Sequence, residues 1–257
     1  MPIEPEAPIY SRPPVSEALI DIKVKTLPDE KIPKLEALHN QFLPKFPVKK
    51  RRFQAAGKIN IEQAGISTTE ISNKPVGFIF ETPDKSLIVQ VKTDGLTLNQ
   101  IKPDPRKSWP GWESLRNEAK LAWERYLEVI GTPRITRLAI RYINQIVIES
   151  DNIDLEEYFT APPKIPSELP QVQDMENFFS RVVFGNSDPK ATVIIIQAQS
   201  PNPYEGKMTI TLDIDIFREY PEPKGDESLW QTLDQFRILK NNIFEASLTQ
   251  KTKALFN

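Results

Sequence analysis

The feature that most constrains the fold is strand-like alternation along most of the chain, interrupted by only two long amphipathic helices. Residues 18–25 alternate apolar and polar side chains, as in a half-buried strand. Residues 112–130 carry apolar side chains at helical spacing, and Gly131 is placed to end that helix. Each long helix follows a run of strands. The pattern predicts an α+β fold: a mainly antiparallel sheet with amphipathic helices packed on one face.

The order of these segments predicts a proline-rich arm at 1–14 and a single α+β domain at 15–257. The domain divides into two halves, 15–133 and 134–257, whose similar plan indicates pseudo-repetition. A proline-rich linker lies near 160–173. The predicted strands are 18–25, 58–71, 76–81, 86–101, 136–148, 192–199 and 207–217, and the predicted helical segments are 29–43, 112–130, 154–159 and 226–248.

Three local signals refine this prediction. Asp29 is expected to cap the helix at 29–43. A tight turn is expected at Pro83-Asp84, and Asp94-Gly95 predicts a hairpin turn or a bulge within 86–101.

Composition excludes several chemistries. The 257 residues contain no cysteine and one histidine, so thiolate chemistry, disulfides and any mechanism that needs two imidazoles are absent. Nine glycines and the lack of a GxGxxG or P-loop pattern argue against a phosphate-cradling loop. The sequence identifies no catalytic residue, and we expect no cofactor. No signal peptide or membrane span is recognisable, so we expect a soluble cytoplasmic protein that does not contact membranes.

Three stretches carry a family resemblance: residues 10–18 (YSRPPVSEA), 137–144 (RLAIRYIN) and 242–249 (NIFEASLT). In matching order over nearly the whole chain, they resemble a sporadically distributed family of uncharacterised bacterial proteins. The resemblance implies a bacterial cytoplasmic protein whose genes are scattered as those of defence systems and mobile elements are. It implies no activity, cofactor or catalytic residue.

Two aspartates form the first candidate site. Asp213 and Asp215 lie two residues apart on a predicted strand, so both carboxylates emerge on one face. With Asp21 or Glu17 from another strand they would suit a divalent metal ion. The alternative, which we favour, is a polar sheet face on which Arg137 and Arg141 pair with the aspartates. The same face, with Asp21 and Lys23, is the predicted recognition surface.

A basic run is the second candidate. Lys49, Lys50, Arg51 and Arg52 lie within residues 45–53, between Phe46 and Phe53. Such a run would contact nucleic-acid phosphates while the aromatic rings stack on bases. The alternative, which we favour, is a solvated loop whose two phenylalanines are tucked into the core.

The remaining motifs give weaker indications of function. Asp84, Gln90 and Lys92 match a nuclease-like pattern, but Asp84 and Gln90 would lie about 20 Å apart on one strand, so we interpret the match as accidental. Trp109 and Trp112 are expected in the core, although they would also suit a pocket. His39 is expected to be a half-buried residue with its hydrogen bonds satisfied.

The leading hypothesis is a non-catalytic partner-binding or regulatory module of a bacterial accessory system. The predicted partner is another protein. The alternatives are a divalent-metal-dependent phosphodiesterase or nuclease that uses Asp213 and Asp215, and a nucleic-acid-binding protein that uses residues 45–53.

Overall fold

The computed structural model describes residues 8–56, 60–62, 65–67, 72–102, 108–149, 154–169, 175–201 and 206–257. The strands are β1 Val15–Val24, β2 Val48–Ala56, β3 Asn60–Glu62, β4 Gly65–Ser67, β5 Ser72–Glu81, β6 Leu87–Lys92, β7 Gly95–Ile101, β8 Ile135–Ile148, β9 Phe179–Ser187, β10 Lys190–Ser200 and β11 Met208–Lys224. The helical segments are η1 Asp29–Lys31, α1 Ile32–Ala37, α2 His39–Phe42, α3 Gly111–Ile130, η2 Leu155–Glu157, α4 Leu229–Ser247 and α5 Gln250–Ala254.

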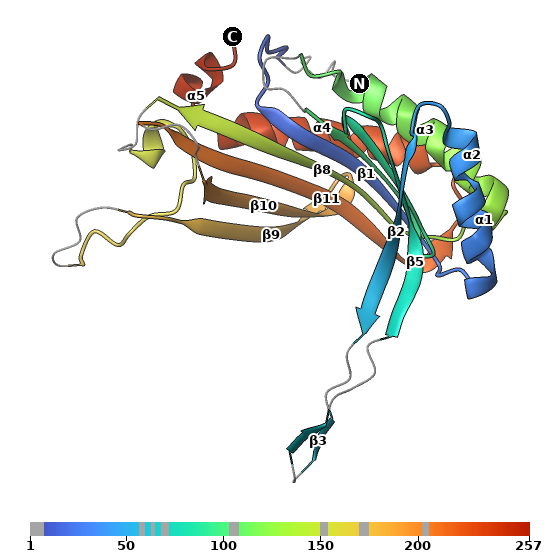
Figure 1. Ribbon diagram of the computed structural model, residues 1–257. Coiled ribbons are helices and arrows are strands. Elements are labelled where there is room, and N and C mark those ends of the chain that lie inside the picture. The colour runs from blue at the N-terminus through green and yellow to red at the C-terminus, as the bar shows by residue number, and fades with distance from the viewer. Residues whose placement is uncertain are drawn as a thin grey trace.

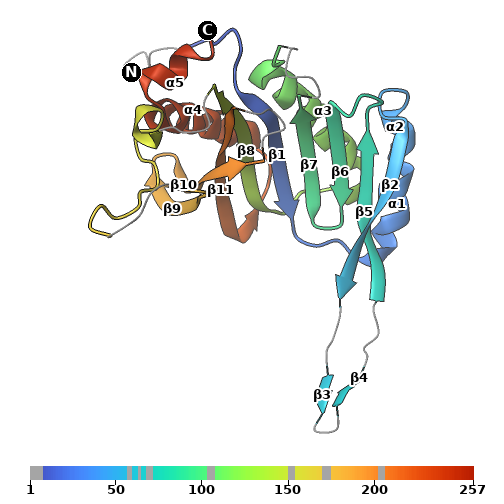
Figure 2. The ribbon, with the colours of Figure 1, turned by 60° about the vertical axis from the view of Figure 1, so that its left-hand side comes forward.

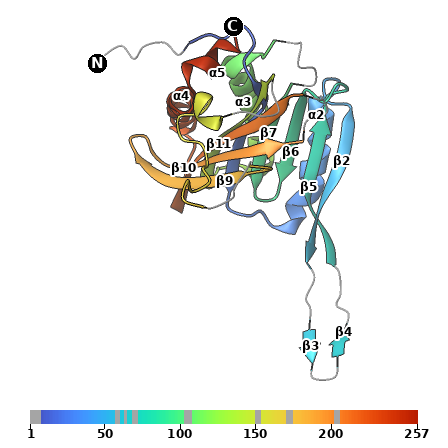
Figure 3. The same cartoon turned by 90° about the vertical axis from the view of Figure 1, so that its left-hand side faces the viewer.

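Nine of the strands form one antiparallel sheet in the order β2-β5-β6-β7-β1-β8-β11-β10-β9, and β3 and β4 form a separate pair (Figure 1). The long helices α3 and α4 pack on the same face of this sheet, which lies in front of them in Figure 3. We call the opposite surface the open face. The predicted α+β fold, with helices on one face of an antiparallel sheet, is confirmed. No described helix is both long and apolar enough to cross a membrane.

The two halves repeat one plan. In the first, β1 lies at the centre, the chain passes through short helices to the sheet edge, and strands β2, β5, β6 and β7 return to pair with β1 before α3 follows. In the second, β8 lies at the centre, and β9, β10 and β11 return to pair with β8 before α4 follows. The strands β1 and β8 pair with each other, so the halves meet in mid-sheet (Figure 2).

Alternation along the central strands builds the core. Ala18, Ile20 and Ile22 of β1 are fully buried on the helix side, beside Ile140 of β8. The apolar stripe of α3 covers the β1 residues, α4 packs on β8, and each buried isoleucine contributes about 1.5–3 kcal/mol. Gly131 ends α3 with φ +73°, a left-handed conformation that favours glycine, as the sequence predicts.

Some predicted boundaries need correction. The helix expected at 29–43 is divided into η1, α1 and α2, and Pro28 rather than Asp29 holds the N-cap position. By contrast, the hairpin turn expected at Asp94-Gly95 within 86–101 is confirmed, because β6 and β7 pair as a hairpin with its turn before Gly95. Of the strand expected at 58–71, residues 57–59, 63–64 and 68–71 lie outside the described residues, and β3 and β4 fall between them.

Three elements were not predicted from the sequence: β2, β9 and α5. The basic run expected as a loop lies in β2, an edge strand that pairs with β5. Phe46, just before β2, is buried, but Phe53 is 52% exposed, so the expectation that both rings are tucked into the core is wrong for Phe53. Four consecutive cations mask the strand pattern because they leave no apolar–polar alternation in the middle of β2.

Candidate functional site

The structure brings five of the six predicted recognition residues into ion pairs with one another on the open face, and the sixth, Lys23, pairs with Asp94 at 3.1 Å. Asp21 lies on β1, Arg137 and Arg141 on β8, and Asp213 and Asp215 on β11. The Arg141 Nε donates to Asp213 Oδ1 at 2.9 Å. The Arg137 guanidinium lies 3.1 Å from Asp21 Oδ2 and 3.6 Å from Asp215 Oδ2. The ion pairing that the sequence favoured over a metal site is therefore present.

Because these side chains pair with one another, their charges are compensated within the open face. Asp21 also accepts hydrogen bonds from Lys92 and Thr97. The hydrogen bond to Asp213 raises the pKa of Arg141, so this guanidinium holds its proton more firmly. Burial raises the pKa of Asp215, and the nearby Arg137 opposes that rise. Within the described part of the chain, no three metal-ligating side chains gather in one place.

The basic run is also engaged with carboxylates. Lys49 and Arg51 lie 3.2 and 3.3 Å from Glu36 of α1, and these contacts lower the pKa of that carboxyl. Lys50 donates to Glu81 on the open face. Its neighbour Arg52 donates to Gln90. The strand thus places its cations alternately on the two sheet faces, each beside a polar partner.

The remaining sequence motifs have structural roles. Asp84 accepts hydrogen bonds from Thr82 and Ser86 in the turn between β5 and β6, away from any metal-like cluster among the described residues. His39 donates from Nε2 to the carbonyl oxygen of Phe46 at 2.8 Å and is half-buried, as predicted.

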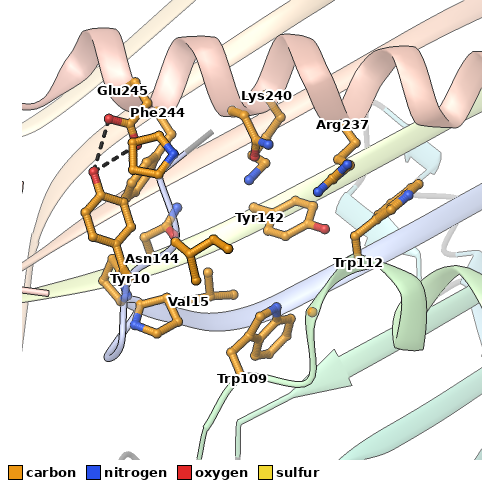
Figure 4. Close-up of a pocket in the computed structure, with 16 residues that line it drawn as sticks. Tyr10, Val15, Trp109, Trp112, Tyr142, Asn144, Arg237, Lys240, Phe244 and Glu245 are labelled. Atoms are coloured by element: carbon orange, nitrogen blue, oxygen red, sulfur yellow. Dashed lines mark hydrogen bonds between the residues drawn. The ribbon is translucent and has the colours of Figure 1, made fainter. Parts of the chain in front are cut away.

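A pocket of about 280 Å³ lies on the other side of the sheet, between the N-terminal arm, the start of α3 and the middle of α4 (Figure 4). We call it the arm pocket. Its lining residues are Pro8, Ile9, Tyr10, Pro13, Pro14, Val15, Trp109, Gly111, Trp112, Tyr142, Asn144, Arg237, Lys240, Asn241, Phe244 and Glu245.

Three stretches singled out in the sequence, 10–18, 137–144 and 242–249, each contribute residues to this pocket. Residues 10–18 supply its arm side, with Tyr10 and Val15. Residues 137–144 supply Tyr142 and Asn144 from the sheet, and residues 242–249 supply Phe244 and Glu245 from α4. The stretches are separated by 118 and 97 residues in the sequence, so the fold alone brings them together. The pocket is therefore the candidate functional site.

Two cations of α4 face the pocket without an acidic partner. Figure 4 shows Arg237 and Lys240 directed from α4 towards Tyr142. The Lys240 ammonium lies 4.2 Å from the centre of the Tyr142 ring, a cation–π contact. Among the described residues, neither cation has a hydrogen bond or ion pair. Burial, reinforced by the charge of Arg237, lowers the pKa of Lys240 to about 8.

The arm closes one side of the pocket. The Tyr10 hydroxyl donates to Glu245 at 2.9 Å, and Lys253 pairs with the same carboxylate at 3.2 Å. Burial and this carboxylate raise the pKa of Tyr10 to about 12. The Arg12 amide donates to the carbonyl of Phe256, which ties the arm to the C-terminal segment. The described part of the arm thus packs on this chain's own α4 and α5.

The opposite side is fixed by a tie between the two long helices. Asp234 of α4 accepts hydrogen bonds from the Trp112 indole at 2.9 Å and from Arg116 Nε at 3.0 Å. Gly111, with φ +87°, allows the chain to enter α3 at the pocket, so the positive end of this helix dipole lies there. Trp112 is buried and also lines the pocket, so both expectations for it hold.

Sequence reasoning missed the cationic centre of this pocket. Lys240 falls on the apolar face of α4, four residues after the buried Phe236. A lysine at such a position is desolvated unless its ammonium reaches water or a partner. That pattern was the available signal for Lys240. No local pattern links it to Tyr10 or Tyr142, which only the tertiary fold brings near.

Comparison with known proteins adds little. No protein-family model matches the sequence, and no curated protein matches it. Among solved structures, Methanococcus jannaschii TBP aligns with 88% of this chain and 95% of its own length, at 12% identity and a TM-score of 0.25. A similarity this low carries no argument about function.

Proposed function

We propose that this chain is a non-catalytic binding module whose ligand is a small organic anion held in the arm pocket. It acts as a regulatory component of a bacterial accessory system, through a protein partner. The observation that carries the proposal is the unpaired pair of cations, Arg237 and Lys240, inside an aromatic pocket.

The electrostatics of the pocket favour a negative ligand. A desolvated ammonium without an ion-pair partner destabilises the empty pocket, since the nearby Glu245 carboxylate is paired with Tyr10 and Lys253, and a bound anion removes that cost. The neighbouring guanidinium and the start of α3 add positive potential of the same sign. Aromatic faces of Trp109, Tyr142 and Phe244 suit a planar or apolar body attached to the anionic group. A volume near 280 Å³ limits the ligand to a small molecule.

Apart from Lys240, whose pKa of about 8 keeps it mostly protonated at pH 7, the described lining residues of the pocket offer no free general base. Its one carboxylate, Glu245, already accepts from Tyr10 and pairs with Lys253. The single histidine lies elsewhere, bonded to Phe46. This lining supports a binding role rather than acid–base catalysis.

The test is calorimetric titration with phenyl phosphate, benzoate and inorganic phosphate, with benzyl alcohol as the neutral analogue. We expect the organic anions to bind and benzyl alcohol to fail. Lys240→Met should weaken binding at least about tenfold, the loss of one charge-assisted contact. Lys120→Met, an exposed lysine of α3, is the matched control and should leave binding unchanged. Failure of all three anions at millimolar concentration, or equal binding by Lys240→Met, would contradict the proposal.

The open face remains the second candidate for recognition. If it binds the partner, Arg141→Ala and Asp215→Ala should each weaken the complex, whereas the arm-pocket variant Lys240→Met should not. Its ion pairs Arg137–Asp215 and Arg141–Asp213 support a structural role for these residues instead.

Two titrations test the alternatives, one for metal-dependent hydrolysis and one for nucleic-acid binding. Mg²⁺ or Mn²⁺ binding that is lost on Asp213→Asn with Asp215→Asn would support a metal site. A strong dependence of oligonucleotide affinity on salt, reduced in Lys50→Gln, would support nucleic-acid binding by β2. Because Asp213 pairs with Arg141 and Lys50 pairs with Glu81, these ion pairs support neither metal binding nor nucleic-acid binding.

A further inference from the structure

The edge strand β9 exposes an unusual amount of apolar surface. Phe179 is 69% exposed, Val182 52% and Val183 48%, and Phe184 is exposed as well. Arg181 is the only charged residue in Phe179–Ser187. On its inner side β9 pairs with β10 without a register shift, and no described strand pairs with its outer side. Its outer backbone groups therefore form a regular, unpaired edge.

The opposite edge of the same sheet is protected. There β2 carries four consecutive cations, Lys49 to Arg52, and its register with β5 shifts after Arg52. Charges and bulges are the usual devices that prevent edge-to-edge pairing. The edge strand β9 has a single charge, Arg181, and no bulge, so it is less protected against edge-to-edge pairing than β2.

The side-chain pattern of β9 is that of an interior strand. Val182 and Phe184 lie opposite Ile195 and Val193 of β10, and Val193 is fully buried on the helix side. Val183 and Phe179 point to the open face. A strand that is apolar on both faces is typical of a sheet interior. The repeated plan agrees, because the first half contributes five strands to the sheet and the second half only four.

We propose that β9 pairs with β9 of a second copy of this chain, antiparallel and centred on Val183, to form a symmetric dimer with one continuous sheet. Val183 is the midpoint of the nine-residue strand, so this register overlaps it completely. Val182 then lies opposite the partner's Phe184, and Arg181 opposite the partner's Gly185, so no like charges meet. A twofold axis perpendicular to the sheet keeps the helices of both copies on the same face. Such a self-complementary patch closes as a dimer rather than a fibre.

Charge substitution at the symmetry centre tests the proposal. Analytical ultracentrifugation should show the wild type passing from 29.4 kDa monomer to a species of twice that mass between about 1 and 100 µM. Val183→Lys and Val183→Asp should each be monomeric over that range, because the substitution places like charges opposite each other. Mixing the two variants should restore a dimer that native mass spectrometry identifies as the heterodimer.

Val147→Lys is the matched control, since Val147 of β8 is also an exposed strand valine at 40% but lies away from the edge. It should dimerise like the wild type. A wild type that stays monomeric overturns the proposal, as does a Val183→Lys variant that dimerises normally. Failure of the mixed variants to associate, with each folded by circular dichroism, overturns the proposed register.

Discussion

The charge of Lys240, a residue of the arm pocket, lowers the free energy of unfolding. Its pKa falls from 10.5 to about 8 on folding, so between those values the unfolded chain holds a proton that the folded chain releases. Stability therefore rises as the pH increases from about 8 to 10.5, and the full penalty is present below pH 8. We expect Lys240→Met to raise the free energy of unfolding at pH 7 by about 2 kcal/mol, in urea titrations.

The gain should shrink as the pH increases from 8 to 10.5, where the wild-type lysine becomes neutral in both states. Lys120→Met, at an exposed position, should leave the free energy of unfolding unchanged both at pH 7 and at pH 10.5. Equal stability of Lys240→Met and wild type at pH 7 would show that the ammonium is not desolvated.

The same pKa sets the pH dependence of ligand binding. An anion favours the charged form of Lys240, so binding raises its pKa and takes up a proton near pH 8. We expect the affinity for phenyl phosphate to fall as the pH increases from 7 to 9. Calorimetry in buffers of different ionisation enthalpy should detect the proton uptake at pH 8, and its absence in wild type would contradict the role of Lys240.

Asp21 is the residue on which the open-face network depends. It is buried and accepts hydrogen bonds from Lys92, Thr97 and Arg137. Asp21→Asn keeps the shape but removes the carboxylate that pairs with Lys92 and leaves Arg137 with only the longer contact to Asp215, so we expect a loss of about 3 kcal/mol in chemical unfolding. Glu157→Gln breaks the exposed pair with Lys251 and should cost less than about 1 kcal/mol. Similar losses in the two variants would refute the burial argument.

Among the helices, those with strong periodicity could be predicted and the short ones could not. The apolar stripe of α3 and its end at Gly131 fix its position within about one residue. The segment 29–43 has helical spacing too, yet it folds as three short pieces, because packing against the sheet decides its path. Strand β2 escaped because cations on both faces hide its alternation, and β9 because its apolar residues occur on both faces.

The contacts between residues of the arm pocket could not be predicted from the sequence either. The motifs at 10–18, 137–144 and 242–249 could be singled out, but nothing in them states that Tyr10 lies beside Glu245. By contrast, the pairing of Arg141 with Asp213 followed from residue type and strand face alone. Sequence thus predicts contacts between neighbouring strands better than contacts between an arm and a helix.

The tie between α3 and α4 holds the pocket in shape. Asp234 receives the Trp112 indole and two guanidinium nitrogens of Arg116. We expect Asp234→Ala to cost about 1–2 kcal/mol and to speed hydrogen exchange in the first turns of both helices. Glu113→Ala, an exposed carboxylate on the same turn of α3, is the control. Unchanged exchange in Asp234→Ala would show that packing alone fixes the helices.

At the scale of the whole molecule, the two repeated halves are joined by more than their linking chain. Ile20 of β1 and Ile140 of β8 are direct partners in the sheet, and both are fully buried. The arm, which precedes the first half, binds α4 and the C-terminal segment of the second through Tyr10 and Arg12. The tie at Asp234 adds a third connection, between the long helices.

Because each half would expose one edge of the central pair and part of this shared core, neither has a separate hydrophobic core to unfold around. We therefore expect a single calorimetric transition, with a calorimetric enthalpy equal to the van't Hoff enthalpy of the cooperative unit. Hydrogen exchange should be slowest in β1 and β8 together. Two resolved transitions, or slow exchange confined to one half, would show that the halves fold as separate domains despite the continuous sheet.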